Sequence, residues 1–363
     1  MDDRNYWLGF SVFSGIGPMK FKKLLNSFGS AKDAWEVPKS DLARLLGEKL
    51  AEKFDEFRDK FSIEDYVNEL EKKDVYFVTL KDKEYPKLLS QIRNPPFVLY
   101  VRGDPSSLRS SGSSVAVVGT RRTSQYGREV TKILTEELVA NGFTIVSGLA
   151  IGVDAISHKT AIDNGGKTIA VLGCGVDCCN PAENLRLYND IIQKGSVVIS
   201  ELPLGHPPTK GSFPSRNRII AGLSMGVLVT EGAEDSGSLI TADYAIKFNR
   251  KVFAVPGPIT SSLSKGPYKL IAKGAKLVTS AEDIISELGI TGRKSTTGIT
   301  GRKKISGDTK EETMILKILQ NEAMHFDEIV RKTGLQSSSV GSMLSVMEMK
   351  GMVKSLEGGM FSI

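Results

Sequence analysis

The sequence predicts an α/β protein built around a doubly wound parallel sheet, with a helical segment before it and a winged-helix-like segment after it. Short apolar, β-branched runs recur between helical stretches through the middle of the chain. Such continuous runs are typical of parallel strands buried on both faces, and the strand–helix–strand rhythm joins them into one sheet. Helical periodicity dominates both flanks of this central part.

Length, charge and cysteine content set the general class. The chain has 363 residues and a formal net charge of +6, so two or three domains and a polyanionic partner are both compatible with it. No signal-peptide pattern is present, and no apolar run approaches the roughly 20 residues that span a membrane. The three cysteines, Cys174, Cys178 and Cys179, are clustered and odd in number. We therefore expect a cytoplasmic protein without a membrane partner.

Composition divides the chain into four segments. Residues 1–75 are helical with charged faces, and residues 76–288 alternate strands and helices. Residues 289–310 form a basic, Gly- and Thr-rich linker that contains the hexapeptide GITGRK twice. Its low apolar content argues against a packed core. Residues 311–363 return to helical periodicity and end in two short β-like runs.

The strands of the central segment follow from its apolar runs. One helix between them, 126–140, should turn Val130, Ile133, Leu134 and Leu138 towards one side. Ligands on such sheets bind beyond the carboxyl ends of the strands. We expect strands at Val115–Val118, Thr144–Val146, Thr168–Leu172, Val197–Ile199, Val227–Val229, Val252–Val255 and Lys276–Val278.

Three loops are expected to meet at that edge: 119–124, 147–154 and 236–238. Each combines glycine, which allows close backbone approach, with Ser or Thr, which can cap a helix. The start of a helix attracts anions, and arginines beside it favour phosphate. The alternative is that these are only tight turns. The candidate residues in the loops are Gly119, Thr120, Arg121, Arg122, Gly148, Ser236, Gly237 and Ser238.

Further basic candidates lie on neighbouring segments. Arg216 and Arg218 are two residues apart on an expected helix, so their side chains point to different faces. One of them should face the ligand site at the carboxyl edge of the sheet, and the other should form an ion pair. The sequence leaves open which arginine does which. Arg186, on the helix after Asn180-Pro181, and Lys210, in the loop before Phe213, complete the set.

No cofactor, metal or catalytic constellation is expected. The stretch AIDNGGKT at 161–168 fits a permissive phosphate-loop pattern, but a helix precedes it and a strand follows, the reverse of a true phosphate loop. The cysteines lack zinc-site spacing and are more consistent with small buried side chains. His158, His206 and His325 lie in three different contexts. Glu201 and Glu231 end strands at the ligand edge, where we expect them to pair with the arginines.

The two ends of the chain carry weaker signals. Ser14-Gly15-Ile16-Gly17-Pro18 resembles a helix–hairpin–helix turn, which either binds a phosphate through backbone N–H groups or is purely structural. Helices expected at 311–319, 325–332 and 337–349, followed by a β-ribbon, describe a winged helix-turn-helix. The third of these helices carries almost no basic charge, so a protein contact is at least as consistent with it as a DNA contact.

These motifs together resemble the DNA-processing protein A family, over nearly the whole chain. The resemblance implies a sterile-alpha-motif-like helical domain, an extended Rossmann domain and a variable winged-helix-like domain. Thr120, Asn180 and Tyr268 depart from the residues usual in the family. The matching stretches are PPFVLYVRG, GTRR, SGLAIGVDAISH, TIAVLGCGVD, SELP, FPSRNRIIAGLS, SGSLITA, VFAVPG and LIAKGAKLV.

The resemblance also implies a function without catalysis. It implies binding of single-stranded DNA, homodimerisation through the Rossmann domain, and loading of RecA recombinase during natural transformation. By position Arg121 matches the family's DNA-contacting arginine, and either Arg186 or Leu185 lies at the second basic contact. Two alternatives remain: an enzyme that processes nucleotides, in which Glu231 would act, and a sensor of a small nucleotide.

Overall fold

The computed structural model describes residues 2–290, 307–319, 322–356 and 358–362. The chain forms two compact units, Met1–Thr296 and Thr297–Ile363. Residues 291–306 of the expected 289–310 linker lie outside the described residues, and with them the second GITGRK copy and all of the first except Gly289 and Ile290.

Helices make up the first 72 residues of the first unit, as expected. Ser30 and Ser62 cap two of them, each accepting a hydrogen bond from the backbone N–H three residues on. The helices share an aromatic core in which the Phe10 and Phe54 rings stack with centroids 4.9 Å apart. The helices are α1 (Asp3–Val12), α2 (Pro18–Phe28), α3 (Ala31–Glu36), α4 (Lys39–Leu46), α5 (Glu48–Lys60) and α6 (Ile63–Lys72).

A nine-stranded sheet follows, in the order β1-β2-β6-β5-β4-β3-β7-β8-β9. Strands β3 to β9 are parallel, which confirms the doubly wound parallel sheet. The bounds are β1 (Val75–Thr79), β2 (Val98–Gly103), β3 (Ser114–Val118), β4 (Thr144–Ser147), β5 (Thr168–Val171), β6 (Val197–Ser200), β7 (Gly226–Val229), β8 (Lys251–Ala254) and β9 (Lys276–Leu277).

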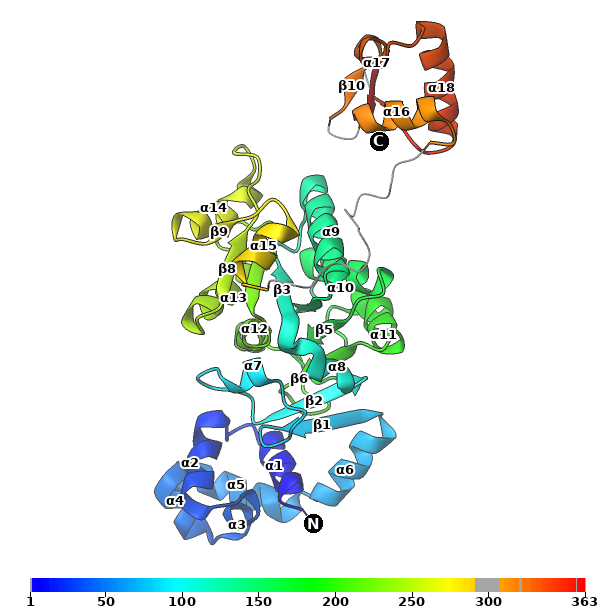
Figure 1. The fold of residues 1–363 in the computed structure, drawn as a ribbon. Coiled ribbons are helices and arrows are strands. Elements are labelled where there is room, and N and C mark those ends of the chain that lie inside the picture. The colour runs from blue at the N-terminus through cyan, green and yellow to red at the C-terminus, as the bar shows by residue number, and fades with distance from the viewer. Residues whose placement is uncertain (1, 291–306, 320–321, 357, 363) are drawn as a thin grey trace. The chain divides into compact units, whose positions relative to one another are not determined.

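Two strands at one edge of the sheet were not expected. The stretch PPFVLYVRG was not among the expected strands, but β2 within it pairs antiparallel with β6, and β1 pairs antiparallel with β2. The aromatic core of α1–α6 packs against this pair, and the Phe21 and Phe97 rings stack at 4.2 Å. The helical segment is therefore joined to the sheet through β1 and β2, as Figure 1 shows.

Helices cover both faces of the sheet (Figure 1). Alternate residues of the strands enter different cores: Val118 and Val171 pack with α7, α12, α13 and α14, whereas Val117 and Ile145 pack with α9, α10 and α15. A third core lies under α11. These elements are α7 (Lys87–Ser90), α8 (Ser106–Arg109), η1 (Ser110–Ser113), α9 (Gln125–Ala140), α10 (Val153–Asp163), η2 (Ala182–Asn184), α11 (Leu185–Gln193), α12 (Ser212–Gly222), α13 (Gly237–Lys247), η3 (Ser262–Ser264), α14 (Lys265–Ala272) and α15 (Ala281–Glu287).

The strand order reverses at β3. From β3 the chain proceeds through β4, β5 and β6 on one side, and later through β7, β8 and β9 on the other. Such a reversal opens a crevice at the carboxyl ends of the two diverging strands, here β3 and β7. The loops after these strands are two of the three that the sequence predicted to meet.

The inward face of α9 differs from the expected one. Leu134 and Leu138 are buried as predicted, whereas Ile133 is 52% exposed. Gly127 and Thr131 take the buried positions in the first turns of the helix. A Cβ at Gly127 would lie 1.9 Å from Oε2 of Glu231, so the glycine leaves room for that carboxylate.

The loop after β3 is held from two directions. The carbonyl of Glu231, at the end of β7, accepts the N–H of Thr120 at 2.8 Å. The carbonyl of Thr120 accepts the N–H of Val153 at 3.2 Å. Gly152 supports this contact at φ +88°, where a Cβ would lie 2.3 Å from the Thr120 oxygen. The backbone of the turn that carries Arg121 therefore packs directly against Gly152, where no side chain would fit.

The second unit is a small winged helix. Helices α16 (Lys310–Leu319), α17 (Phe326–Thr333) and α18 (Ser337–Met349) enclose one apolar core. Its sheet has the order β10-β12-β11, with bounds Met324–His325, Met360–Ser362 and Lys354–Leu356. The predicted three helices and β-ribbon are confirmed, and β10 adds a third strand.

Within the described ranges we find no helix with the length and apolar content needed to cross a membrane.

Phe54→Ala should lower the free energy of unfolding by about 3–5 kcal/mol, because it opens a cavity in the aromatic core of α1–α6. Urea titration followed by circular dichroism measures the loss. The neighbouring exposed Lys53→Ala serves as control and should change stability by less than about 0.5 kcal/mol. Equal stability of the two variants would contradict this account of the core.

Gly152→Ala should destabilise the loop after β3, because it forces a Cβ against the Thr120 carbonyl at a positive φ. We expect a lower melting temperature and faster hydrogen exchange in residues 119–124. Gly237→Ala is the matched control, since Gly237 opens a helix and its Cβ would meet nothing within 4 Å. Unchanged exchange in residues 119–124 of Gly152→Ala would refute the supporting role of Gly152.

Candidate functional site

A pocket of about 470 Å³ opens where the strand order reverses. Its walls come from the loops after β3, β4 and β7, the start of α13 and one side of α12. The three loops that the sequence predicted to meet therefore all contribute to this pocket, the loop after β4 through Ala150 and Asp154. Three arginines and two aspartates are among the residues that line it. The polar and aromatic lining residues are Thr120, Arg121, Arg122, Asp154, Phe213, Arg216, Asn217, Asp235, Ser236, Ser238 and Thr241.

Arg121 and Phe213 lie together in the lining of this pocket. The guanidinium carbon of Arg121 lies 5.9 Å from the centre of the Phe213 ring. Arg121 and Arg122 are exposed, and neither pairs with a carboxylate among the residues that the structure describes. The pocket therefore has an aromatic surface and two cations that remain available to a ligand.

Arg216 is a cation set deep beside the pocket, with only 7% of its surface exposed. Its Nη1 donates to the carbonyls of Gly148, which follows β4, and Val171, which ends β5. Its Nε donates to Asn217 Oδ1 at 3.2 Å. A Cβ at Gly148 would lie 2.2 Å from Nη1, so only glycine leaves space for the guanidinium. Burial lowers the pKa of Arg216 from its ordinary value, while Asp154 opposes that shift.

Asp154 is the buried anion that accompanies Arg216. Its Oδ2 accepts the N–H groups of Gly148 at 3.1 Å and Ala150 at 3.4 Å. Burial raises the pKa of Asp154, and the neighbouring Arg216 and these hydrogen bonds pull that pKa down. The carboxylate thus fixes the backbone of the loop after β4.

The start of α13 forms another part of the wall. Ser236 caps the helix, and its Oγ lies 3.4 Å from the Ser238 N–H and 2.8 Å from the Ser238 Oγ. Asn217 donates to the carbonyl of Gly237 at 3.2 Å and thereby connects α12 to α13. The N–H of Gly237 has no acceptor within the described part of the chain. This helix start presents donors to the pocket.

The structure brings most, but not all, of the predicted residues together. Gly119, Thr120, Arg121, Arg122, Arg216 and Ser236–Ser238 line the pocket. Gly148 does not, because its N–H is bonded to Asp154 and its Cα faces Arg216. Arg218 is the residue that forms an ion pair, with Glu201, and it also donates to the Asn94 carbonyl at 2.9 Å.

Two predicted basic residues lie outside the pocket lining. Arg186 is exposed in the first turn of α11, and Lys210 is exposed in the turn that precedes α12. Neither forms an ion pair with a described residue. A strand of nucleic acid could reach them only by extending beyond the pocket.

The sequence analysis did not name Phe213 or Asn217 as site residues, and it included Asp154 only as the last residue of the candidate loop 147–154. Phe213 precedes the first arginine of α12 by three residues, which places both near the pocket once the helix is recognised. That spacing was the available signal. Asp154 and Asn217 depended on tertiary contacts that no local pattern shows.

The candidate catalytic groups are occupied by structural contacts. Glu231 was expected to pair with an arginine. Instead its carboxylate accepts two hydrogen bonds from Ser124, one from the backbone N–H at 3.0 Å and one from the side-chain hydroxyl at 2.5 Å. It therefore anchors the start of α9. The Nδ1 of His158 contacts Thr168 Oγ1 at 2.6 Å inside the protein, and burial lowers the pKa of this imidazole to about 3.

One of the three cysteines is buried, as the sequence predicts, and the other two are only partly so. Cys174 is buried, its Sγ donates to the Cys178 carbonyl at 3.0 Å, and Cys178 and Cys179 are half-buried. Burial raises the pKa of the Cys179 thiol to about 11. Among the described residues no group of His, Cys, Asp and Glu has the arrangement of a metal site.

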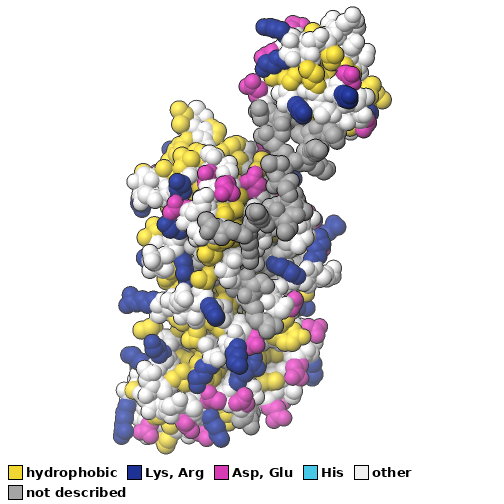
Figure 2. Space-filling view, viewed as in Figure 1, with side chains coloured by type: hydrophobic (Ala, Val, Ile, Leu, Met, Phe, Trp, Pro, Cys, Tyr) yellow, Lys and Arg dark blue, Asp and Glu magenta, His cyan; other side chains and the backbone are white. Residues whose placement is uncertain are grey.

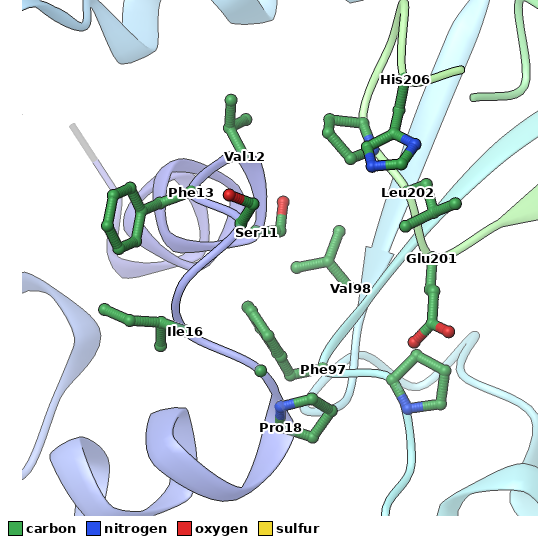
Figure 3. Close-up of a pocket in the computed structure, with 14 residues that line it drawn as sticks. Ser11, Val12, Phe13, Ile16, Pro18, Phe97, Val98, Glu201, Leu202 and His206 are labelled. Atoms are coloured by element: carbon green, nitrogen blue, oxygen red, sulfur yellow. The ribbon is translucent and has the colours of Figure 1, made fainter. Parts of the chain in front are cut away.

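A second pocket, of about 200 Å³, lies beside the turn that resembles a helix–hairpin–helix. Figure 3 shows Val12, Ile16 and Pro18 on one side of it, Leu202 and His206 on the other, and Phe97 between them. Apolar side chains dominate this lining. Gly15 is also packed, because a Cβ there would lie 2.5 Å from Leu50. These contacts favour the interpretation that the turn is purely structural over the interpretation that it binds a phosphate.

Surface charge alone does not single out either pocket. Figure 2 shows Lys and Arg side chains scattered among Asp and Glu over the visible face of the first unit. The candidate site is defined instead by the arginines, the aromatic ring and the helix start that come together at the switch point, the place between β3 and β7 where the strand order reverses.

Comparison with known proteins identifies the family. Residues 76–289 match the DNA recombination-mediator protein A family, and residues 303–359 match the DprA winged helix domain. The chain is 46% identical to DNA processing protein DprA of Bacillus subtilis over 58% of this chain and 70% of that protein. It is 40% identical to Protein Smf of Synechocystis over 79% of this chain and 73% of that protein.

Solved structures agree with this assignment. The structure of DNA processing protein A from Streptococcus pneumoniae superposes with a TM-score of 0.67 at 37% identity, covering 78% of this chain and 97% of that one. DNA processing protein A from Helicobacter pylori, described with a unique single-stranded DNA binding mode, gives a TM-score of 0.53 at 34% identity, covering 58% and 95%. The chain belongs to the DNA recombination-mediator protein A family.

Proposed function

We propose that the pocket at the switch point binds single-stranded DNA. The observation that carries this proposal is the pairing of Arg121 with the Phe213 ring in the lining of the pocket. Proteins that hold single strands combine cations along the phosphates with aromatic faces on which bases stack. The family relative from Helicobacter pylori, described as binding single-stranded DNA, supports the same assignment.

In the proposed complex the exposed Arg121 and Arg122 neutralise phosphates, and a base stacks on Phe213. Arg186 and Lys210 would contact phosphates farther along the strand, outside the pocket. Ser236, Gly237 and Ser238 add hydrogen-bond donors at the start of α13. Phosphate contacts and stacking do not read base edges, so binding should depend strongly on salt and weakly on sequence.

We further propose the biological role that family membership suggests. The protein would protect incoming single strands and help load RecA recombinase during natural transformation and recombination. It would act as a homodimer through the sheet domain, and without catalysis. Glu231 supports the last point, because its carboxylate is already bonded to Ser124 and faces the start of α9.

Arg121→Ala should weaken binding to a single-stranded oligonucleotide by about 1.5–3 kcal/mol, the range for a charge-assisted hydrogen bond. Removing one phosphate contact should also reduce the salt slope by about 0.7. Fluorescence anisotropy at several salt concentrations measures both quantities. Arg44→Ala is the control, since Arg44 is an exposed arginine on α4 that pairs with Asp41. Wild-type affinity of Arg121→Ala at low salt would overturn the assignment.

Phe213→Leu should lower the affinity by about 1–3 kcal/mol, because it removes the stacking surface. Since no charge is lost, the salt slope should stay near the wild-type value. Phe213→Trp preserves an aromatic face and should retain most of the affinity, with fluorescence quenched by the bound base. A loss in Phe213→Leu that is accompanied by an equal loss in Phe213→Trp would argue against stacking.

A further inference from the structure

The inner wall of the pocket contains a second arrangement of donors, distinct from Arg121 and Phe213. There the side of α12 meets the start of α13, joined by the bond from Asn217 to the Gly237 carbonyl. Arg216 contributes its guanidinium from α12, and Gly237 contributes its N–H from α13. The two groups come from different elements and both belong to the pocket lining.

Arg216 has donors to spare at this wall. Its Nη1 bonds to two carbonyls and its Nε bonds to Asn217, whereas its Nη2 has no acceptor in the described ranges. Arg216 as a residue is only 7% exposed, so an anion that reaches its guanidinium meets the charge in surroundings that screen it less than bulk water does. The start of the 11-residue α13 adds the partial positive charge of a helix N-terminus.

We propose that this inner wall is a subsite for a phosphate monoester, supplied by the end of a DNA strand or by a free nucleotide. A monoester carries between one and two negative charges near neutral pH, whereas an internal phosphodiester carries one. Asp154, also in the lining, offsets part of the positive charge of Arg216. The positive charge that remains attracts a monoester more strongly than a diester, because the monoester is more negative.

Pocket shape favours a terminal group as well. The inner wall is backed by Val118, Ile220 and Thr241, each at most 3% exposed, so the pocket is closed beneath it. An internal phosphate that reached Arg216 would draw in a nucleoside on both sides, and a terminal phosphate draws in one. A volume of about 470 Å³ lies within the range of sites for small ligands.

For strand ends, the inference rests on the proposed binding of single-stranded DNA. The experiment compares one short oligothymidylate with a 5′-phosphate, with a 3′-phosphate and with neither, by fluorescence anisotropy on the full chain. We expect one of the phosphorylated forms to bind about 5–10-fold more tightly than the unphosphorylated form. The phosphorylated form that gains affinity shows which end of the strand enters the subsite. Competition by thymidine monophosphate or inorganic phosphate tests whether a free nucleotide or free phosphate binds there as well.

A pair of variants at Gly237 makes the test specific. Gly237→Pro removes the N–H at the first position of α13, where proline fits a helix and follows Ser236 at ψ 137°. Gly237→Ala retains the N–H and is the matched control. The ratio of affinities with and without the terminal phosphate should fall towards one in Gly237→Pro and persist in Gly237→Ala.

Three outcomes distinguish failure of the monoester subsite from failure of the proposed single-stranded DNA binding. Equal affinity of all oligonucleotides for the wild type would overturn the monoester subsite while leaving single-strand binding intact. A preference that survives Gly237→Pro would place the site elsewhere. Where no oligonucleotide binds, the proposed function fails, and thermal stabilisation by thymidine monophosphate in Gly237→Ala but not in Gly237→Pro would still support the subsite.

Discussion

The buried guanidinium of Arg216 is the contact around which the carboxyl edge of the sheet is built. It bonds the carbonyl that follows β4 and the carbonyl that ends β5, and Asp154 fixes the loop between β4 and α10 next to it. A charge this deep is tolerated only when it is paired and hydrogen-bonded. Gly148 leaves the space because it has no Cβ, so the arginine explains why a glycine stands at this position.

The same edge shows how structural anchors free other groups for binding. Glu231 anchors α9 through Ser124, and its carbonyl anchors the turn that carries Arg121. Glu201 holds Arg218 away from the pocket. Among the described residues neither Arg121 nor Arg122 pairs with a carboxylate, and Arg121 lies over the Phe213 ring. The result is a cationic and aromatic surface held on the helices and strands of the sheet domain.

Local pattern was sufficient for the parallel sheet and for the meeting of the three glycine-containing loops, because parallel strands end at one edge. It could not show that β2 runs antiparallel, since a buried strand has the same composition in either direction. The choice between Arg216 and Arg218 needed the position of Glu201, 15 or more residues away. The role of Glu231 needed a contact with Ser124 across 107 positions of the chain.

The central claim is that single-stranded DNA occupies the pocket between the loop after β3 and α12. Photo-crosslinking of a 5-iodouracil oligonucleotide, followed by mass spectrometry of the digested protein, tests it most directly. The account predicts that Phe213 is the main cross-linked residue and that excess unlabelled single strand, but not duplex, suppresses the product. Cross-links confined to α1–α6 or to the winged helix, with Phe213 unmodified, would contradict it.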